Sequence, residues 1–271
     1  MKTSSNNLVT RALRQMDRAF WCLHDHLPTF AVLGLPTLFA AMALAAIVTL
    51  LLRTWDLDLF SGYVLWSVIV PVLAMTILTF LPLPCAVFAW FQVRNEPKTV
   101  KECFAWCFHR AGRLSGIFFW LVFSYTWWFL LLGLPMLILW PRTCQVPMVA
   151  LFEEGPRILR RSRQLMREDN AIHVLAGLFF LLTLVLGLLI PLPRLILFSK
   201  LFEGEWTRVA EQSLWAFELM SAILLLSVIA ISWCVSLTLF YHDLRQYREG
   251  EAVRSKVERL FEKYVHVGVT Q

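Results

Sequence analysis

Charged residues avoid five long stretches of this 271-residue chain and gather in the segments between them. The uncharged runs cover Leu27–Leu52, Leu59–Val93, Leu114–Pro141, Asn170–Pro193 and Leu219–Tyr241. Each is long enough for an α-helix that crosses a hydrocarbon core of about 30 Å, which takes roughly 20 residues. Hydrophobic residues make up 58% of the chain and charged residues 16%, whereas soluble globular chains average roughly 45–50% and about 25%. The sequence therefore predicts an all-α, polytopic membrane protein.

The number of spans follows from the placement of Lys and Arg. Five spans with a cytoplasmic amino terminus would put 12 basic residues inside and 13 outside, and one further crossing between Leu114 and Phe152 changes this to 20 and 5. Because cytoplasmic loops carry the excess of Lys and Arg, we predict about six spans in a bacterial cytoplasmic (inner) membrane, with both termini cytoplasmic. The added arm, Met136 to Phe152, is short and contains Pro141 and Pro147, so we expect a bent or partly unwound span.

A basic amphipathic segment precedes each predicted pair of spans. The apolar stripes of helical period are Val9, Leu13, Met16, Phe20, Leu23 and Leu27; Val100, Cys103, Phe104, Cys107 and Phe108; and Ile158, Leu159, Ser162, Leu165 and Met166. Such segments are typical of interfacial helices beside anionic headgroups, and docking onto partner proteins is the alternative. The pattern indicates one unit used three times, as parallel repeats of interfacial helix, outgoing span and returning span.

The chain is expected to form a single membrane domain over residues 1–271. We divide it into a cytoplasmic amphipathic leader at 1–27, a membrane bundle at 28–242 and a cytoplasmic basic tail at 243–271. A fourth amphipathic stripe lies in the tail and has no span after it. Its members are Val253, Val257, Leu260, Phe261 and Tyr264.

Two short motifs resemble a family of bacterial six-span membrane proteins. Residues 153–156 followed by 158–165, EEGP and ILRRSRQL, are similar to the family's "E-G, then A-L-x-R-S-x-x-L" stretch. Tyr241-His242-Asp243-Leu244-Arg245, with Glu249-Gly250, resembles its "Y-Y-D-L-R" and "E-G" at the end of the last span. The family includes the membrane domain attached to some glycerophosphodiester phosphodiesterases, and stand-alone relatives. The resemblance implies a six-helix membrane module. It does not imply phosphodiesterase activity, which would need a further soluble barrel.

Residues that could carry chemistry are few. Cys22, His24 and His26, and Cys103, Cys107 and His109, form two clusters that match no standard zinc spacing, so we expect neither a metal site nor a cofactor. No serine-protease-like order, phosphate-binding glycine loop or zinc-protease motif occurs. Two ionisable groups near the predicted outer surface, Arg142 and Glu218, are the remaining functional candidates.

We therefore expect the cytoplasmic motifs to serve assembly or interaction. The candidate residues are Glu153, Arg161, Ser162, Tyr241, Asp243 and Arg245. A carboxylate at the inner end of a span needs a partner, and the predicted topology favours an Asp243–Arg161 pair. The expected function is a non-enzymatic interaction, scaffold or membrane-homeostasis module. Its expected partners are anionic membrane lipids and other membrane proteins, with no nucleic acid. A permease or flippase-like transporter of an apolar or amphipathic substrate is the alternative, and a lipid-modifying enzyme is a third class.

Overall fold

The computed structural model describes residues 5–54, 80–130, 143–155, 157–166, 171–189 and 207–268. Within these ranges all regular secondary structure is helical, which confirms the all-α class. The helices are α1 (Ser5–Asp25), α2 (Leu27–Thr54), α5 (Leu83–Val93), α6 (Val100–His109), α7 (Ala111–Leu130), α9 (Val146–Phe152), α10 (Ile158–Met166), α11 (Ala171–Leu189) and α13 (Thr207–Gly268). Six of them lie in segments that were predicted as spans: α2, α5, α7, α9, α11 and part of α13.

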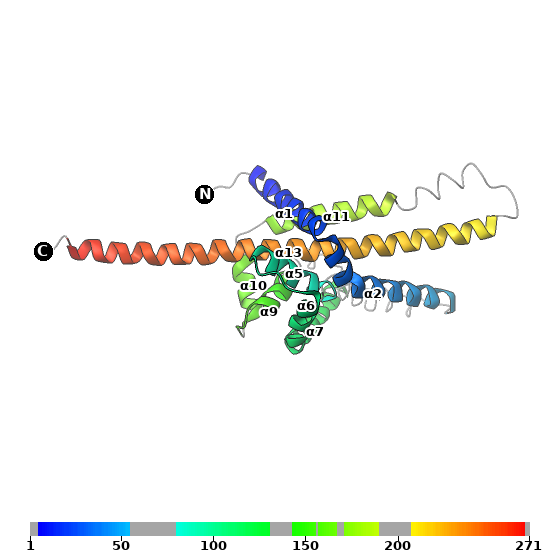
Figure 1. Cartoon of the computed structure of the whole chain (residues 1–271), viewed down its shortest axis with the longest axis horizontal. Helices are drawn as coiled ribbons and strands as arrows, with labels where there is room; N and C mark the ends of the chain where they lie inside the picture. The colour runs from blue at the N-terminus through cyan, green and yellow to red at the C-terminus, as the bar shows by residue number, and fades with distance from the viewer. Residues whose placement is uncertain are drawn as a thin grey trace.

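Helix α13 is the axis around which the other helices pack. It is 62 residues long, and Figure 1 shows it passing through the body and continuing beyond it towards the carboxyl end. Helices α1, α2, α5, α9, α10 and α11 all contact it. The helix runs without a break through residues 242 and 243, so the predicted tail continues the last apolar segment as one helix.

Two pairs of consecutive helices are sharply bent. Helix α1 meets α2 at 100° and α10 meets α11 at 95°. In each pair the first helix is the basic amphipathic one and the second is apolar. An amphipathic helix that lies in an interface followed by a helix that leaves it has this geometry, and so has a single span that is broken in the middle.

Helices α5 and α9 are short and enclosed. Residues Leu83–Phe91 of α5 and Val146–Leu151 of α9 are buried on every side, which explains why both sequences are apolar without period. Pro84 and Pro147 lie in the first turns of these helices, where a missing backbone N–H has no intrahelical partner to lose. Within the described part of the arm Met136 to Phe152, helix is interrupted by a turn at Cys144 and Gln145, and Pro147 lies in the first turn of the helix that follows.

The ends of these two helices meet α13 in an aromatic cluster. Trp90 of α5 stacks on Phe152 of α9, with ring centroids 4.5 Å apart. Tyr241 of α13 lies 5.5 Å from Trp90 and 6.0 Å from Phe152. Tyr241 and Trp90 are both buried. Because aromatic pairs at these separations contribute beyond their buried area, the cluster fixes where three distant segments of the chain converge.

Helix α1 packs with a different face from the one its periodicity indicates. It buries Ala12, Gln15 and Ala19, and contacts α11 and α13. Val9 and Phe20 of the predicted apolar stripe are 44% and 41% exposed. Small residues allow close helix packing, so α1 uses them against its neighbours. Met16 and Leu23 of the apolar stripe also pack against the core, and its other members are exposed.

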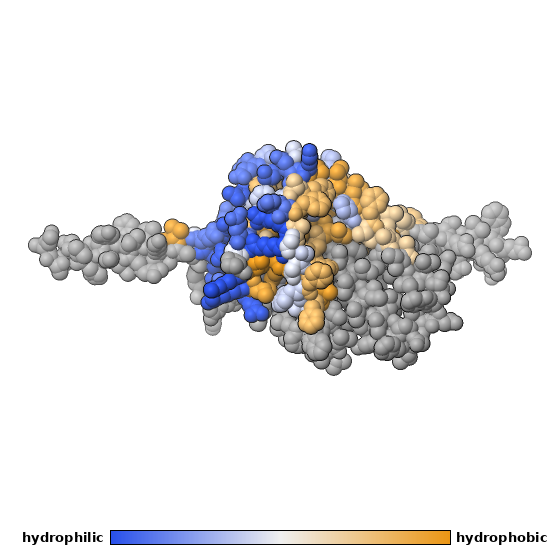
Figure 2. Space-filling view, turned by 90° about the horizontal axis from the view of Figure 1, so that it is seen from below, coloured by the Kyte–Doolittle hydropathy of each residue, from blue (hydrophilic) through white to orange (hydrophobic). Residues whose placement is uncertain are grey.

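The surface of the described residues divides into a polar end and an apolar belt. Figure 2 shows hydrophilic residues gathered towards the carboxyl-terminal half of α13 and hydrophobic residues on the other side of a narrow boundary. The exposed apolar residues of the belt include Val32, Leu35 and Phe39 of α2, Phe119 and Phe123 of α7, Leu181, Leu184 and Val185 of α11, and Met220, Leu224 and Val228 of α13. Helix α13 crosses from the belt to the polar end.

The described residues contain one helical segment that is by itself long and apolar enough to cross a membrane, Met220–Gly250, and up to three if each bent pair forms one span. The apolar helices Leu83–Val93 and Ala111–Ser124 are shorter. The six predicted spans are therefore not confirmed, and several of the intervening segments lie outside the described residues.

Candidate functional site: a polar network and two clefts

A hydrogen-bonded network at the polar end joins α9, α10 and α13. The Tyr241 hydroxyl donates to Glu153 Oε1 at 2.7 Å, and Arg161 Nε donates to both oxygens of the same carboxylate at 3.1 and 3.2 Å. Arg161 Nη2 also donates to Glu249 Oε1 at 3.2 Å, to which Arg245 Nε donates at 2.9 Å. The network brings together four of the predicted site residues and adds Glu249.

Helical periodicity explains why these side chains meet. Tyr241, Arg245 and Glu249 follow one another at intervals of four, so they share one face of α13. Glu153 directly follows α9, and Arg161 lies in the first turn of α10. The two sequence motifs are therefore two halves of one connection, which ties the α9–α10 corner to the long helix.

The predicted Asp243–Arg161 pair is wrong. Asp243 Oδ2 accepts from Arg18 Nη1 at 2.7 Å and from Gln15 Nε2 at 2.5 Å. Two residues apart on an α-helix means about 200° of rotation, so Asp243 faces α1 while Tyr241 faces α9 and α10. Asp243 does have a basic partner, as expected for a carboxylate at the end of a span, but this partner is Arg18 of the amino-terminal helix α1.

The remaining candidates lie elsewhere. Ser162 is fully buried on the core face of α10. Glu218 lies on α13 at a separation from Tyr241 of roughly 35 Å along the helix axis, at 1.5 Å per residue. Arg142 lies outside the described residues.

Side chains of α6, of α7 and of Arg110 between them bind the carbonyl groups at and just after the end of α9. Trp106 Nε1 donates to the Leu151 carbonyl at 3.2 Å, and Arg110 Nη1 donates to the same oxygen at 2.6 Å. Arg113 donates to the carbonyls of Glu153 and Gly155. The last carbonyls of a helix lack intrahelical donors, and these donors supply them. Sequence analysis missed this contact because the acceptors are backbone atoms.

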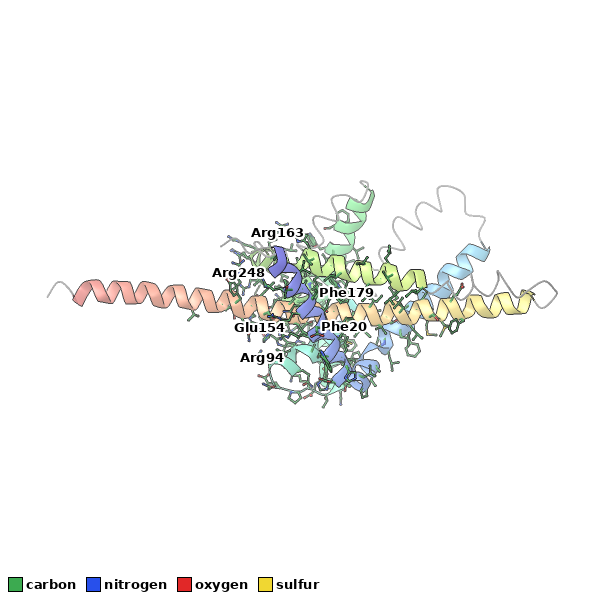
Figure 3. All side chains as sticks on the ribbon, turned by 90° about the horizontal axis from the view of Figure 1, so that it is seen from above. Phe20, Arg94, Glu154, Arg163, Phe179 and Arg248 are labelled. Carbon is green, nitrogen blue, oxygen red and sulfur yellow. The ribbon has the colours of Figure 1, made fainter. Side chains whose placement is uncertain are left out.

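Two clefts open beside the network. The first, about 700 Å³, has a floor of aromatic rings that includes Trp90, Trp106 and Phe152, and a rim of both charges. The second, about 640 Å³, lies between the end of α9 and the start of α10, and is lined by Arg157, Arg160, Arg161 and Gln164 with Glu153 as its one acidic residue. In Figure 3 the labelled Arg94, Glu154, Arg163 and Arg248 lie on the carboxyl-terminal side of Phe179 along α13, so this end is strongly charged.

The described residues contain no group of three or more His, Cys, Asp or Glu side chains placed to hold a metal. All six cysteines are free thiols. Burial raises the pKa of Cys103 to about 11 and that of Cys107 to about 12. A thiol with a raised pKa is a poor nucleophile and a poor metal ligand at neutral pH, so α6 uses its cysteines as packing groups.

No family model, curated protein or solved structure matches this chain. The resemblance to the six-span family stays a prediction from the two motifs.

Proposed function

We propose that this chain is a multi-pass integral membrane protein of the bacterial cytoplasmic membrane, with about six spans and its polar end on the cytoplasmic side. We propose further that it acts as an interaction or scaffold module, through lipids or partner proteins, and has no catalytic function. The observation that carries the proposal is the division of the surface into an apolar belt and a polar end, crossed by α13 (Figure 2).

The apolar belt supports the membrane assignment. The exposed apolar side chains of the belt lie on α2, α7, α11 and α13. Contiguous exposed apolar surface of this kind is rare on soluble monomers and is typical of lipid-facing or protein-facing surface. The right-angle bends that precede α2 and α11 agree with interfacial helices that lead into spans.

The chemistry of the first cleft supports a binding role over catalysis. Glu153 accepts from Tyr241 and Arg161, and Glu249 accepts from Arg161 and Arg245. These groups are engaged in holding three helices together.

A transporter remains the second candidate because of a separate apolar pocket. It has a volume of about 460 Å³ and lies between α2, the start of α5, α6 and α7, with Pro36, Phe104, Leu114 and Phe118 in its lining. An apolar passage needs no charged lining, so a lipid chain or another apolar substrate could use it.

In-cell crosslinking followed by native mass spectrometry in lipid nanodiscs tests the proposal. We expect the protein to enter nanodiscs and to retain either a stoichiometric partner protein or specific lipids. Failure to enter nanodiscs, with the protein found in the soluble fraction, would refute the membrane assignment. A retained apolar small molecule that is lost on replacing Phe118 by Trp, without a partner protein, would favour transport.

A further inference from the structure

The cleft between α9 and α10 contains more arginines than are paired with acidic groups among the described residues of this chain. Three of its lining side chains are guanidinium groups, and Glu153 is the one acid among them. Arg161 is committed to Glu153 and Glu249, so these groups largely offset one another. Arg157 and Arg160 are exposed, and within the described part of the chain neither guanidinium group has a hydrogen bond or ion pair.

The arginines are presented by a fixed surface. Positions 157, 160, 161 and 164 follow the spacing i, i+3, i+4 and i+7, which places them on one face. The opposite face buries Ser162, Leu165 and Met166 in the core. The Arg161 N–H donates to the Arg157 carbonyl at 2.9 Å, so the helical turn includes Arg157. The ion pair between Arg161 and Glu153 fixes the orientation of this face relative to α9.

The cleft lies where the chain changes from polar to apolar. Helix α10 meets the apolar α11 at 95°, so its arginines lie at the level where the apolar belt begins. Val149 and Ile158 give the cleft an apolar wall beside the arginines. A soluble anion would make no favourable contact with these apolar side chains. A phospholipid has both a charged headgroup for the arginines and apolar chains for the apolar wall.

We propose that this cleft binds the phosphate group of an anionic phospholipid, with Arg157 and Arg160 as its ligands and Arg161 as the residue that positions the helix. This inference rests on the proposed membrane function. The planar guanidinium fork matches phosphate oxygens in a bidentate geometry, and two such groups can serve both non-bridging oxygens of one phosphodiester. Basic pockets beside membrane spans on the cytoplasmic side recognise anionic headgroups in this way.

The test compares matched double variants in nanodiscs made of phosphatidylglycerol and phosphatidylcholine in equal amounts. Native mass spectrometry measures the ratio of the two lipids retained by each protein. We expect the wild type to prefer phosphatidylglycerol and R157Q/R160Q to lose at least about fivefold of that preference, since one arginine near a charged surface contributes about this factor. The control R14Q/R163Q removes the same charge from two exposed arginines outside the cleft. It loses only the diffuse attraction to anionic lipid that R157Q/R160Q also loses, so its loss of preference should be clearly smaller.

Further variants and a competition experiment distinguish a specific phosphate site from diffuse charge attraction and from a site for a soluble phosphate compound. R157K/R160K keeps the charge but loses the bidentate fork, so we expect an intermediate preference. Equal losses in R157Q/R160Q and R14Q/R163Q would overturn the proposal in favour of diffuse charge attraction, and no loss in either would overturn it as well. Inorganic phosphate at millimolar concentration should not displace the lipid; displacement would assign the cleft to a soluble phosphate compound.

The inference and the proposed function can fail separately. A wild-type protein that does not enter nanodiscs refutes the membrane function itself. A wild-type protein that enters them without preferring either lipid refutes only the phosphate site. Thermal unfolding of every variant in detergent shows whether a lost preference reflects a lost fold.

Discussion

Glu153 is the residue whose removal should test the network at the polar end most directly. Its side chain is 17% exposed and accepts from the hydroxyl of the buried Tyr241 and from Arg161. A hydrogen bond to a charged group contributes about 1.5–3 kcal/mol. The pair with Arg161, whose side chain is 33% exposed, adds at most about 1 kcal/mol because solvent screens it.

We therefore expect Glu153→Ala to lower the free energy of unfolding by about 2–4 kcal/mol, and Tyr241→Phe to lower it by about 1.5–3 kcal/mol. The matched control is Glu154→Ala, since this neighbouring side chain is 90% exposed and should cost no more than about 0.5 kcal/mol. Unfolding of the purified protein in mixed micelles, followed by tryptophan fluorescence, gives all three values.

The double variant Glu153→Ala/Tyr241→Phe measures whether the Glu153 carboxylate and the Tyr241 hydroxyl interact directly. If the hydrogen bond is formed as described, combining Glu153→Ala with Tyr241→Phe costs less than the sum of the single changes by about 1–2 kcal/mol. Strict additivity, or a Glu153→Ala variant as stable as Glu154→Ala, would refute the reasoning.

Three further outcomes follow from the contacts described above. Asp243→Ala should cost about 1 kcal/mol and add to the effect of Arg161→Gln within about 0.5 kcal/mol, because the two residues lie on different connections; a large coupling in the same unfolding assay would restore the direct pair. Burial raises the pKa of Cys107 to about 12, so maleimide should label it slowly in the folded protein, with a rate that rises about tenfold per pH unit between pH 7 and 9; rapid, pH-independent labelling would contradict this. The backbone N–H and hydroxyl of Thr99 donate to Glu102 and lower the pKa of its carboxyl below the usual 4.5, so this stabilisation is present above pH 4.5 and is lost as the pH falls below it. Thr99→Ala should lower the melting temperature at pH 7 and reduce its dependence on acid, and an unchanged acid profile would count against the capping box.

Sequence periodicity could predict part of the site because local spacing fixes which residues share a helix face. Tyr241, Arg245 and Glu249 lie at intervals of four, and the same arithmetic shows that Asp243 cannot join them. The predicted topology placed Asp243 and Arg161 at the same end of the molecule. It could not predict how α13 is rotated about its axis, and so which neighbouring helix each of its side chains faces. The partner of Asp243 comes from α1, 225 positions away from it in the chain, and no local pattern reports such a distance.

The packing of the short helices α5 and α9 could not be predicted from the sequence for a different reason. An apolar run such as Leu59–Val93 has the composition of a span whether its residues contact lipid or protein. In the described part of this run, α5 contacts protein on all sides, and its length of 11 residues is set by the turn at Pro82 and by the charged residues after Val93. The hydrogen bonds from Trp106, Arg110 and Arg113 to backbone carbonyls could not be predicted, because every residue has a carbonyl group and the sequence does not indicate which one accepts.

The length of α13 gives the molecule a mechanical property. At 1.5 Å per residue its 62 residues extend about 93 Å, roughly twice the 40–45 Å of a whole bilayer with its headgroups. The other helices hold it from Ile223, which packs beside Ala41 of α2, to Glu249, which pairs with Arg161. The helix then continues for about 28 Å to Gly268, so a tilt of the held stretch by about 10° would move Gly268 by about 5 Å. A small rotation inside the body is thereby converted into a larger displacement at the carboxyl end.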